Sequence, residues 1–434
     1  MFGFQKGWHR LLLGAVLNSP LIYSQSAMAT DNELVILTTF SQAPITALVD
    51  DFKQHYPEAE VRVVHRRTQS SLQLLSKSYM QDIDLVLSSS PFLMQDLVNQ
   101  HRLTDMSSRV QVPEWLAPYL LPNKDKVIAF GYSGAGVVWN KDYVTANQLP
   151  EPSRFQDLTN PLYFGHVTMS TPSRSGTTQL MVESVLSQYG WEKGWSILLN
   201  IGANLATISS RSFGVADYIA KGKLGLGPTI DSYALIAQRK FDYVGFSYDK
   251  DFTLMPTYIA QVNRGKSDKL AESFISHILS QGVQEQMEAS TFAKTALNDA
   301  ARYYGENPVL NMDQVMPRER LINLVFDTAI TKRLPELQDA WLTLIKMKRQ
   351  AHGNPKKLNA LKEIEHKLFD LPISNEDVAI VAQKLSAMDK NSEVGMTQYQ
   401  AALAEFSHNL GGAMSLKLDT VNKELAQWRG KDNS

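Results

Sequence analysis

Short apolar runs that end in hydroxyl-rich turns and lead into residues at helical spacing recur through the first two thirds of this chain. Residues 34–37, Leu-Val-Ile-Leu, form the first such run, and apolar residues at helical spacing follow from Ile45 onward. A continuous apolar run is typical of a parallel strand that is covered on both faces. Strands that alternate with amphipathic helices indicate βαβ units. The sequence therefore predicts an α/β fold with parallel sheets, whose ligands gather beyond the carboxyl ends of the strands.

This alternation occurs twice, and a long apolar stretch separates the two halves. Further strands of the first half are predicted at residues 61–65 and 83–87. Residues 127–140 are apolar, glycine-punctuated and too long for one buried strand, so we expect them to cross into a second lobe. A return strand is expected at residues 253–263. The expected boundaries are residues 30–130 for the first part of lobe 1, 131–255 for lobe 2, and 256–316 for the return to lobe 1 and the hinge.

The chain changes character after about Pro317, and we expect residues 317–434 to form a helical C-terminal section. Apolar residues recur at helical spacing around Trp341, no convincing strand follows, and residues 374–377 (Ser-Asn-Glu-Asp) resemble a helix start signal. Residues 393–429 predict a further helix that is broken or bent at Gly411-Gly412. We interpret the apolar stripes of this section as its own core together with a docking face for lobe 2.

The first 29 residues have the pattern of a cleavable secretory signal. Lys6, His9 and Arg10 form a positive start before a short apolar run at residues 11–17, and Ala27-Met28-Ala29 has the form of a cleavage site. A buried N-terminal helix is the alternative. The chain has no cysteine, which excludes disulfides, thiolate metal ligands and a lipid-bearing cysteine, and no later segment reaches about 18 consecutive apolar residues. We therefore expect an exported, soluble, periplasmic protein that does not insert into the membrane after signal cleavage.

The charge balance limits the kinds of partner. Lys and Arg together number 43 and Asp and Glu 44, so there is no global basic field to attract nucleic acid or anionic lipid. A nucleic-acid partner is not expected, and any site for an anion has to be local.

The strongest candidate for a local anion site is the stretch STPSRSGTTQL at residues 170–180, which precedes a predicted helix. A phosphate or carboxylate favours free backbone N–H groups at the N-terminus of a helix, where the dipole is positive. A glycine lets the main chain come close to the ligand, hydroxyl groups add neutral donors, and an arginine can bind two oxygens. Ordinary N-capping is the alternative, although a cap needs only one hydroxyl. The candidate ligand-binding residues here are Ser173, Arg174, Ser175, Gly176, Thr177 and Thr178.

Other predicted strands also end in polar turns. Arg66 and Arg67 follow the second strand, and Arg211 lies between serines at a corresponding turn of lobe 2. Guanidinium groups from both lobes would suit a ligand with two anionic ends. Exposed arginines are the alternative interpretation. The matching hydroxyl-bearing turns of lobe 1 carry Thr39, Ser41, Ser88 and Ser89, for which capping of the following helix is a comparable explanation.

Several stretches resemble the family 1 extracellular solute-binding proteins, which are type II periplasmic binding proteins, in the branch related to ferric-ion and hexose-phosphate binders. They include DIDLVLSSSPFLMQDLV, FGYSGAGVVWNKDYV, MSTPSRSGTTQLMVESVLSQYGWEKGW and GKLGLGPTIDSYA, within residues 33–299. The resemblance implies two lobes that close on a small solute like a hinged trap. It also implies phosphoglycerates or phosphoenolpyruvate as ligands and a membrane histidine kinase as the partner that receives the signal. The alternative is a binding component of an ABC importer, with a permease as partner and hexose phosphates or another organophosphate as ligand.

The same resemblance bears on metal binding near residue 230. Ferric-ion relatives use two adjacent tyrosines in this neighbourhood, whereas this chain has Ser232-Tyr233, so the resemblance disfavours iron. Asp231 and Tyr233 are candidates for binding ligand hydroxyls instead. The histidines show no HxxxH or HExxH spacing, and we predict no metal and no cofactor.

The sequence does not support an enzyme. The stretch GYSGA at residues 131–135 lacks the last glycine of a nucleophile elbow, and SRSGTT lacks both the lysine and the leading glycine of a P-loop. We therefore expect a binding protein with no catalytic residues.

Overall fold

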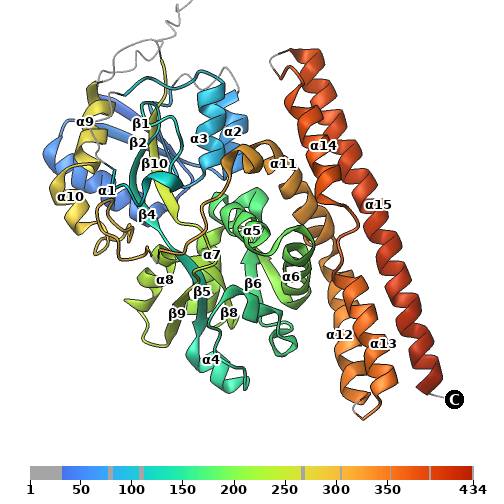
Figure 1. The fold of residues 1–434 in the computed structure, drawn as a ribbon. Coiled ribbons are helices and arrows are strands. Elements are labelled where there is room, and N and C mark those ends of the chain that lie inside the picture. Colours follow the sequence, from blue (N-terminus) through green and yellow to red (C-terminus); the bar gives the residue numbers. More distant parts are fainter. Residues whose placement is uncertain are drawn as a thin grey trace, which may run out of the picture.

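The computed structural model describes residues 32–76, 82–106, 112–264, 269–303, 305–351, 353–390 and 392–432, and the predicted signal at residues 1–29 lies outside them. The chain forms two α/β lobes, each built on a five-stranded sheet, and a separate group of C-terminal helices (Figure 1). The two-lobe α/β architecture and the helical C-terminal section predicted from the sequence are confirmed.

The sheet of lobe 1 has its strands in the order β2-β1-β3-β10-β4. Alternate residues of β1 pack on opposite sides, Val35 and Leu37 in one hydrophobic cluster and Leu34 and Ile36 in another, as expected for a strand covered on both faces. The strands are β1 (Glu33–Thr38), β2 (Glu60–His65), β3 (Leu85–Ser88), β4 (Ile128–Ser133) and β10 (Met255–Gln261). The helices of this lobe are α1 (Gln42–His55), α2 (Thr68–Ser76), α3 (Pro91–Asn99), α9 (Lys269–Ile278) and α10 (Gln281–Gln286), with the short η1 (Ala117–Tyr119).

The sheet of lobe 2 has the order β7-β6-β8-β5-β9. Its strands are β5 (Ala135–Asn140), β6 (Val167–Ser170), β7 (Leu205–Ser209), β8 (Leu226–Ile230) and β9 (Val244–Tyr248). Its helices are α4 (Lys141–Ala146), α5 (Gly176–Tyr189), α6 (Trp191–Asn204), α7 (Ser212–Ala220) and α8 (Asp231–Gln238), with the short η2 (Phe155–Thr159), η3 (Pro161–Tyr163) and η4 (Pro172–Arg174).

The strands that enter a lobe from the other lobe run antiparallel to their neighbours. β10 is antiparallel to β3 and β4, and β5 is antiparallel to β8 and β9, whereas β1, β2 and β3 are parallel. Both sheets are therefore mixed, and the parallel pairing expected from the alternation of strands and helices is found for β1–β3 and for β6–β8. The reason is geometric, because a strand that enters at the edge where its neighbours end must run in the opposite direction. The predicted crossover at residues 127–140 is confirmed as β4 and β5, which meet at Gly134.

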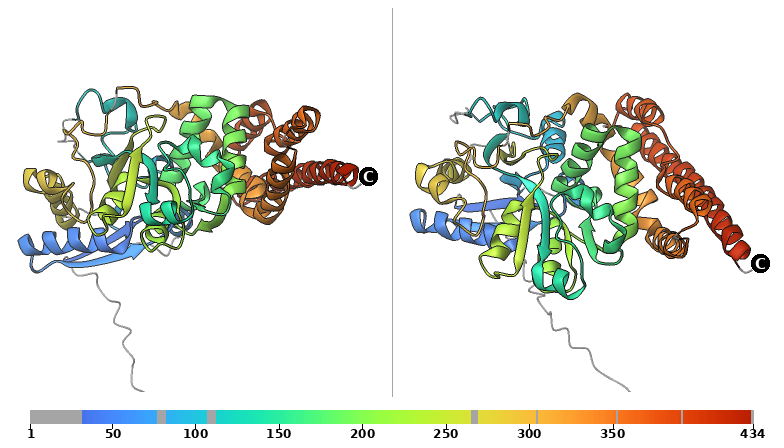
Figure 2. Two further views of the ribbon diagram at one scale, coloured as in Figure 1. Left: turned by 90° about the horizontal axis from the view of Figure 1, so that it is seen from below. Right: turned by 60° about the horizontal axis from the view of Figure 1, so that its bottom comes forward.

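Within the described residues, the C-terminal section contains five helices and the short η5 (Thr331–Arg333), and these helices lie along one side of the molecule in Figure 1. The views of Figure 2 show the same arrangement. The helices are α11 (Met312–Ala329), α12 (Leu334–Gln350), α13 (Pro355–Phe369), α14 (Asn375–Ser386) and α15 (Glu393–Asp432). Ser374 caps α14 in a capping box with Asp377, as its start signal predicted. The predicted break at Gly411-Gly412 is wrong, because α15 continues through both glycines.

Packing explains why the glycines do not interrupt α15. A glycine costs a helix about 1 kcal/mol relative to alanine, which neighbouring burial can offset. Leu410 and Met414 are buried beside the glycines, and Arg333 donates a hydrogen bond of 3.1 Å to the carbonyl of Gly411.

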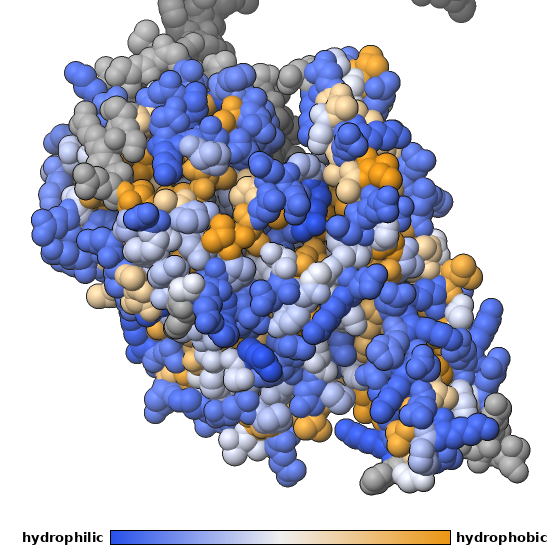
Figure 3. All heavy atoms as spheres, in the orientation of Figure 1, coloured by the Kyte–Doolittle hydropathy of each residue, from blue (hydrophilic) through white to orange (hydrophobic). Residues whose placement is uncertain are grey.

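One hydrophobic core extends from lobe 2 through α11–α15 without interruption. It joins Trp195 and Leu198 of α6 to Trp341 of α12 and Leu410 of α15. The outer surface of the section is mainly hydrophilic with scattered apolar side chains (Figure 3), among them Ile380 and Val394. The apolar stripes are therefore used in a core shared with lobe 2, as the sequence predicted.

Candidate functional site

The candidate site is a small cavity between the two lobes, where strands of both sheets end. The turns after β1, β2 and β3 line it from lobe 1, and the turns after β6, β7 and β8 line it from lobe 2. Loops from six strands converge there, as expected at the carboxyl ends of strands in α/β folds. The predicted site residues that line the cavity are Thr39, Arg67, Ser89, Arg174, Ser175, Gly176, Thr177, Arg211 and Tyr233.

The N-terminus of α5 forms one wall of the cavity. Ser175 caps the helix by accepting a hydrogen bond of 3.2 Å from the backbone N–H of Thr178, and its hydroxyl also lies 2.9 Å from that of Thr177. Within the described residues, no acceptor pairs with the backbone N–H groups of Gly176 and Thr177. The same segment thus provides a cap and two free donors at the positive end of a helix dipole, so N-capping and anion binding are compatible here.

Three arginines reach the cavity without a carboxylate partner. Among the described parts of the chain, no Asp or Glu lies within ion-pair distance of Arg67, Arg174 or Arg211. Burial lowers the pKa of Arg211, and the positive charges of Arg67 and Arg66 lower it further. Arg67 and Arg66 belong to lobe 1 and Arg211 to lobe 2, so the cavity concentrates positive charge from both lobes. An anion between the lobes would remove this repulsion.

Aromatic side chains position the lobe 2 arginine. The Arg211 guanidinium lies 5.6 Å from the centre of the Phe213 ring, and Phe213 packs edge to face against Tyr233 at 6.0 Å. Burial raises the pKa of Tyr233 to about 12, against the opposing effects of the Ser212 hydroxyl and Arg211. Tyr233 is therefore a neutral hydroxyl group at neutral pH and can donate a hydrogen bond to a ligand.

The remaining predicted residues do not line the cavity. Ser41 occupies the N-cap position of α1 without a side-chain cap bond, and the exposed Arg66 donates to the carbonyl of His65. Ser88 is buried, with its hydroxyl 2.9 Å from that of Thr39. Ser173 and Thr178 flank the lining residues of the α5 turn, where the Ser173 hydroxyl lies 2.9 Å from that of Thr171.

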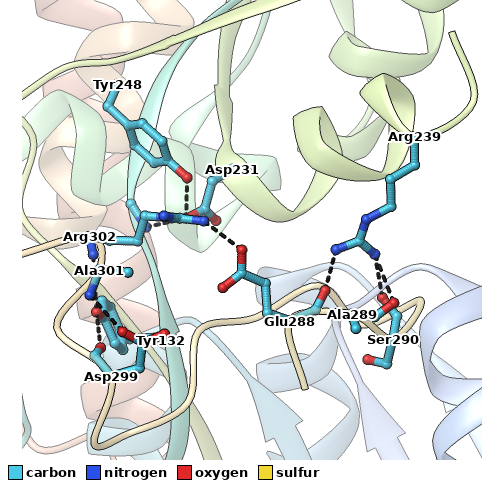
Figure 4. A network of polar contacts seen from close by, with 11 residues as sticks. Tyr132, Asp231, Arg239, Tyr248, Glu288, Ala289, Ser290, Asp299, Ala301 and Arg302 are labelled. Carbon is cyan, nitrogen blue, oxygen red and sulfur yellow. Dashed lines mark hydrogen bonds and ion pairs between the residues drawn. The ribbon is translucent and has the colours of Figure 1, made fainter. Parts of the chain in front are cut away.

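Asp231 lies at the hinge, where it joins a polar network between the lobes (Figure 4). Its Oδ2 accepts hydrogen bonds from the backbone N–H of Gly134 at 2.9 Å and from the Tyr248 hydroxyl at 3.4 Å, and the Arg302 Nε lies 3.6 Å away. Arg302 also pairs with Glu288 at 2.8 Å. Burial raises the pKa of Asp231, against the opposing charges of Lys294 and Arg302. The carboxylate is thus already engaged in the contact between the lobes.

A second interlobe contact lies beside this network. Arg239, which follows α8 of lobe 2, donates to the backbone carbonyls of Glu288, Ala289 and Ser290 in lobe 1 (Figure 4). The guanidinium satisfies three carbonyls at once, which no short side chain could do. The contact therefore stabilises the observed arrangement of the lobes.

The two lobes touch next to the cavity. A Cβ atom on Gly176 would lie 2.5 Å from the Cβ of Ser90, which is too close for any side chain. The cavity itself has a volume of about 30 Å³, similar to the volume of one water molecule in the liquid. The lobes thus leave little free volume between them in this arrangement.

Several lining residues were missed by the sequence reasoning: Phe40, Thr68, Ser90, Ser212, Phe213 and Ile230. Thr68, Ser90 and Ser212 follow strands directly beside residues that were predicted, so a prediction of whole turns would have found them, and Ile230 is the last residue of β8, next to the predicted Asp231. Phe40 and Phe213 gave no signal, because an aromatic residue near a helix start is most simply explained as core.

A much larger cavity lies elsewhere, in lobe 1 between α1 and the α9–α10 region, with a volume of about 760 Å³. Its lining includes His55 and His277, with the His277 Nε2 at 2.8 Å from Asp51, but no lysine or arginine. It is not enclosed by both lobes, so a hinged closure would not bury a ligand there. We therefore regard the smaller interlobe cavity as the solute site.

The structure adds two observations about metals and membranes. No group of three or more His, Asp or Glu side chains in the described residues is arranged to hold a metal ion. Of the Ser232-Tyr233 pair, Tyr233 lines the cavity and Ser232 does not. No described helix combines the length and the apolar character needed to cross a membrane.

Solved structures with a similar fold are periplasmic binding proteins. The protein AfuA from Actinobacillus pleuropneumoniae, with exogenous fructose-6-phosphate bound, aligns with a TM-score of 0.61 at 13% identity, covering 69% of this chain and 98% of that one. The apo ferric ion-binding protein A of Pasteurella haemolytica aligns with a TM-score of 0.55 at 15% identity, covering 68% and 97%. At these identities the likeness concerns the fold alone.

Sequence comparison identifies nearer relatives. The phosphoglycerate transport regulatory protein PgtC of Salmonella typhimurium is 35% identical over 371 residues, which cover 82% of this chain and 91% of PgtC. The family model of the bacterial extracellular solute-binding proteins matches residues 81–315. The matched residues contain all of lobe 2, both crossings of the hinge and the α5 turn, so the chain belongs to the bacterial extracellular solute-binding protein family.

Proposed function

We propose that this protein binds a small phosphorylated carboxylic acid, namely 2- or 3-phosphoglycerate or phosphoenolpyruvate, between its two lobes in the periplasm. The observation that carries the proposal is the cluster of three arginines without counter-ions, Arg67, Arg174 and Arg211, next to the free amides of α5. The name of the relative PgtC, a phosphoglycerate transport regulatory protein, supports the same class of ligand.

Charge favours a phosphorylated acid over simpler anions. A phosphate monoester carries about −1.5 to −2 at pH 7, and a carboxylate adds one further negative charge. Three guanidinium groups from two lobes match that total, and each can bind two oxygens. The α5 N-terminus suits the phosphate, because Gly176 and Thr177 line the cavity and their backbone N–H groups have no acceptor among the described residues. The arginine from the turn after β2 in lobe 1 is then available for the second anionic group.

The protein acts by binding, and its relatives are solute-binding and regulatory proteins. We infer that the bound state is reported to a membrane histidine kinase that controls phosphoglycerate transport. Delivery to an ABC permease is the competing use of the same site. Pull-down of the ligand-loaded protein with each membrane partner would separate these uses, and capture by a permease alone would contradict the sensor role.

Calorimetry on the purified chain without residues 1–29 tests the ligand. We expect 3-phosphoglycerate and phosphoenolpyruvate to bind, and glycerate to bind at least about tenfold more weakly, which is about 1.4 kcal/mol. Inorganic phosphate and a hexose phosphate serve as controls for the carboxylate and for ligand size. Equal affinity for glycerate and 3-phosphoglycerate would contradict the role of the phosphate. Tighter binding of the hexose phosphate would favour the importer alternative.

A further inference from the structure

The C-terminal helical section is joined to lobe 2 as one body. Besides the shared core, the Trp341 indole N–H donates to the side chain of Asn204 at 2.8 Å, and Trp191 of α6 donates to the carbonyl of Ile373 at 2.8 Å. Arg318 of α11 also forms an ion pair of 2.5 Å with the fully buried Glu183 of α5. A close-packed core of this kind does not deform continuously, so the section moves with lobe 2 when the lobes open or close.

Helix α3 of lobe 1 lies against that body. Phe92, in its first turn, belongs to the core of lobe 2 and the helical section, whereas Leu93, Met94 and Leu97 belong to the core of lobe 1. Met316 of α11 packs against both cores. One face of α3 thus holds it in lobe 1, whereas Phe92 packs in the core that lobe 2 shares with the helical section, and α11 reaches the same two cores through Met316.

Asp96 extends the contacting face toward the far end of the helical section. It lies four residues after Phe92 and therefore on the same face of α3. The charges of Arg320 on α11 and Lys390 in the α14–α15 turn lower its pKa, against burial, which is the larger effect and raises it. The Lys390 ammonium itself lies 4.6 Å from the centre of the Tyr399 ring of α15. Asp96 therefore lies within electrostatic reach of α11 and of the α14–α15 turn.

The other end of α3 begins at the solute cavity. Ser90 caps the helix by accepting a hydrogen bond of 3.3 Å from the backbone N–H of Leu93, and it lines the cavity opposite Gly176. At 1.5 Å per residue, the nine residues of α3 span about 13 Å. A single rigid helix thus connects the place where the lobes meet around a ligand with the place where lobe 1 meets the helical section.

We propose that α3 couples occupancy of the interlobe cavity to the position of lobe 1 on the C-terminal helical section, so that the contact of α3 with α11 and the α14–α15 turn reports lobe closure. This inference rests on the proposed function, because it needs a ligand that closes the lobes. The coupling would give the C-terminal helical section a role in signalling that a ligand is bound, which a purely structural extension would not have.

Distances between spin labels test the coupling, and the chain is suited to this because it has no native cysteine. The reporting pair is Asn99→Cys at the end of α3 with Lys384→Cys on α14. A second pair, Asn99→Cys with Gln188→Cys on α5, measures lobe closure itself. The control pair, Gln188→Cys with Lys384→Cys, lies within the joined body. All three positions are exposed.

Addition of 3-phosphoglycerate should change both distances that involve residue 99 and leave the control distance unchanged. A change in the lobe-closure pair without a change in the reporting pair would overturn the inference, because the section would then move with lobe 1. Unchanged distances in all pairs, with binding established by calorimetry, would overturn it as well. Absence of any heat of binding would instead contradict the proposed function and remove the basis of the inference with it.

A charge reversal provides an independent test. Arg320→Glu places a negative charge opposite Asp96, so the closed contact is weakened and affinity for 3-phosphoglycerate should fall about two- to fivefold, the range for one partly exposed charge pair. Because the change also breaks the ion pair of Arg320 with Glu319, circular dichroism checks that the fold is retained. Arg349→Glu is the matched control, since Arg349 is exposed on α12, beside lobe 2. Equal affinities of the two variants would contradict coupling through α3.

Discussion

At the residue scale, the decisive feature of this site is positive charge that the protein itself does not neutralise. Arg211 is half-buried, stacked on Phe213, and repelled by Arg66 and Arg67 from the opposite lobe. Such an arrangement costs stability in the absence of a ligand and is offset when an anion binds. The arginines thus favour binding of an anion and lower the stability of the unliganded protein.

Replacing Arg211 should therefore separate stability from binding. Arg211→Met keeps the volume and the contact with Phe213 but removes the charge, so the melting temperature of the unliganded protein should stay equal or rise. Affinity for 3-phosphoglycerate should fall by about 2–4 kcal/mol, because a desolvated anion loses a charged partner. Calorimetry and thermal unfolding measure the two effects, with Arg349→Met as the control. A variant with a lower melting temperature and unchanged affinity would show that Arg211 has a structural role only.

At the element scale, the N-terminus of α5 has two tasks, because it caps a helix and also forms the point where the lobes meet. Glycine at position 176 satisfies both, since it leaves room for Ser90 and exposes the backbone amide. Alanine would suit the helix better, so the glycine is explained by the contact between the lobes.

Gly176→Ala tests this explanation. The added Cβ would approach Ser90 to 2.5 Å and keep the lobes apart, so affinity for 3-phosphoglycerate should fall at least about tenfold while the fold is retained. Gly282→Ala on α10 is the matched control, because its Cβ meets no atom within 4 Å. Circular dichroism checks the fold and calorimetry the affinity. Wild-type affinity in Gly176→Ala would mean that the lobes do not approach each other at this point when a ligand is bound.

At the scale of the whole molecule, lobe 2 and the helical section share a core, and a buried ion pair lies across their boundary. Glu183 is fully buried and pairs with Arg318. Burial raises the pKa of Glu183, and the Arg318 charge opposes that rise. Loss of the guanidinium alone would leave an unpaired buried carboxylate, which is among the most destabilising of single changes.

Arg318→Met should lower the free energy of unfolding by about 3–5 kcal/mol at pH 8. A carboxyl group whose pKa is raised in the folded state binds more protons there than in the unfolded chain, so its contribution to stability falls as the pH rises. The loss should therefore be smaller near pH 5 than at pH 8. The double variant Glu183→Gln/Arg318→Met should recover most of the stability. Denaturant unfolding at both pH values measures this, and a loss that is independent of pH would contradict the assignment to Glu183.

The sequence by itself determined the repeating units of this protein and the composition of its turns. Strand and helix periods depend on local backbone geometry, so the positions of β1, β2 and the α14 start were predictable from residues 33–65 and 374–377. The arginines and hydroxyl groups after the strands were also visible, because strand ends in α/β folds lie at one edge. The repetition of this pattern on both sides of residues 127–140 predicted two lobes, and the family resemblance added their closure on a solute.

Only the tertiary structure decided which of these residues share a cavity and which do not. Asp231 and Tyr233 are two residues apart, yet one is engaged at the hinge and the other lines the cavity. The direction of β5 and β10, the continuity of α15 through its glycines and the contact of α3 with the helical section likewise depend on segments far apart in the sequence. Local preferences amount to about 1 kcal/mol per residue or less, and the burial of a shared core outweighs them.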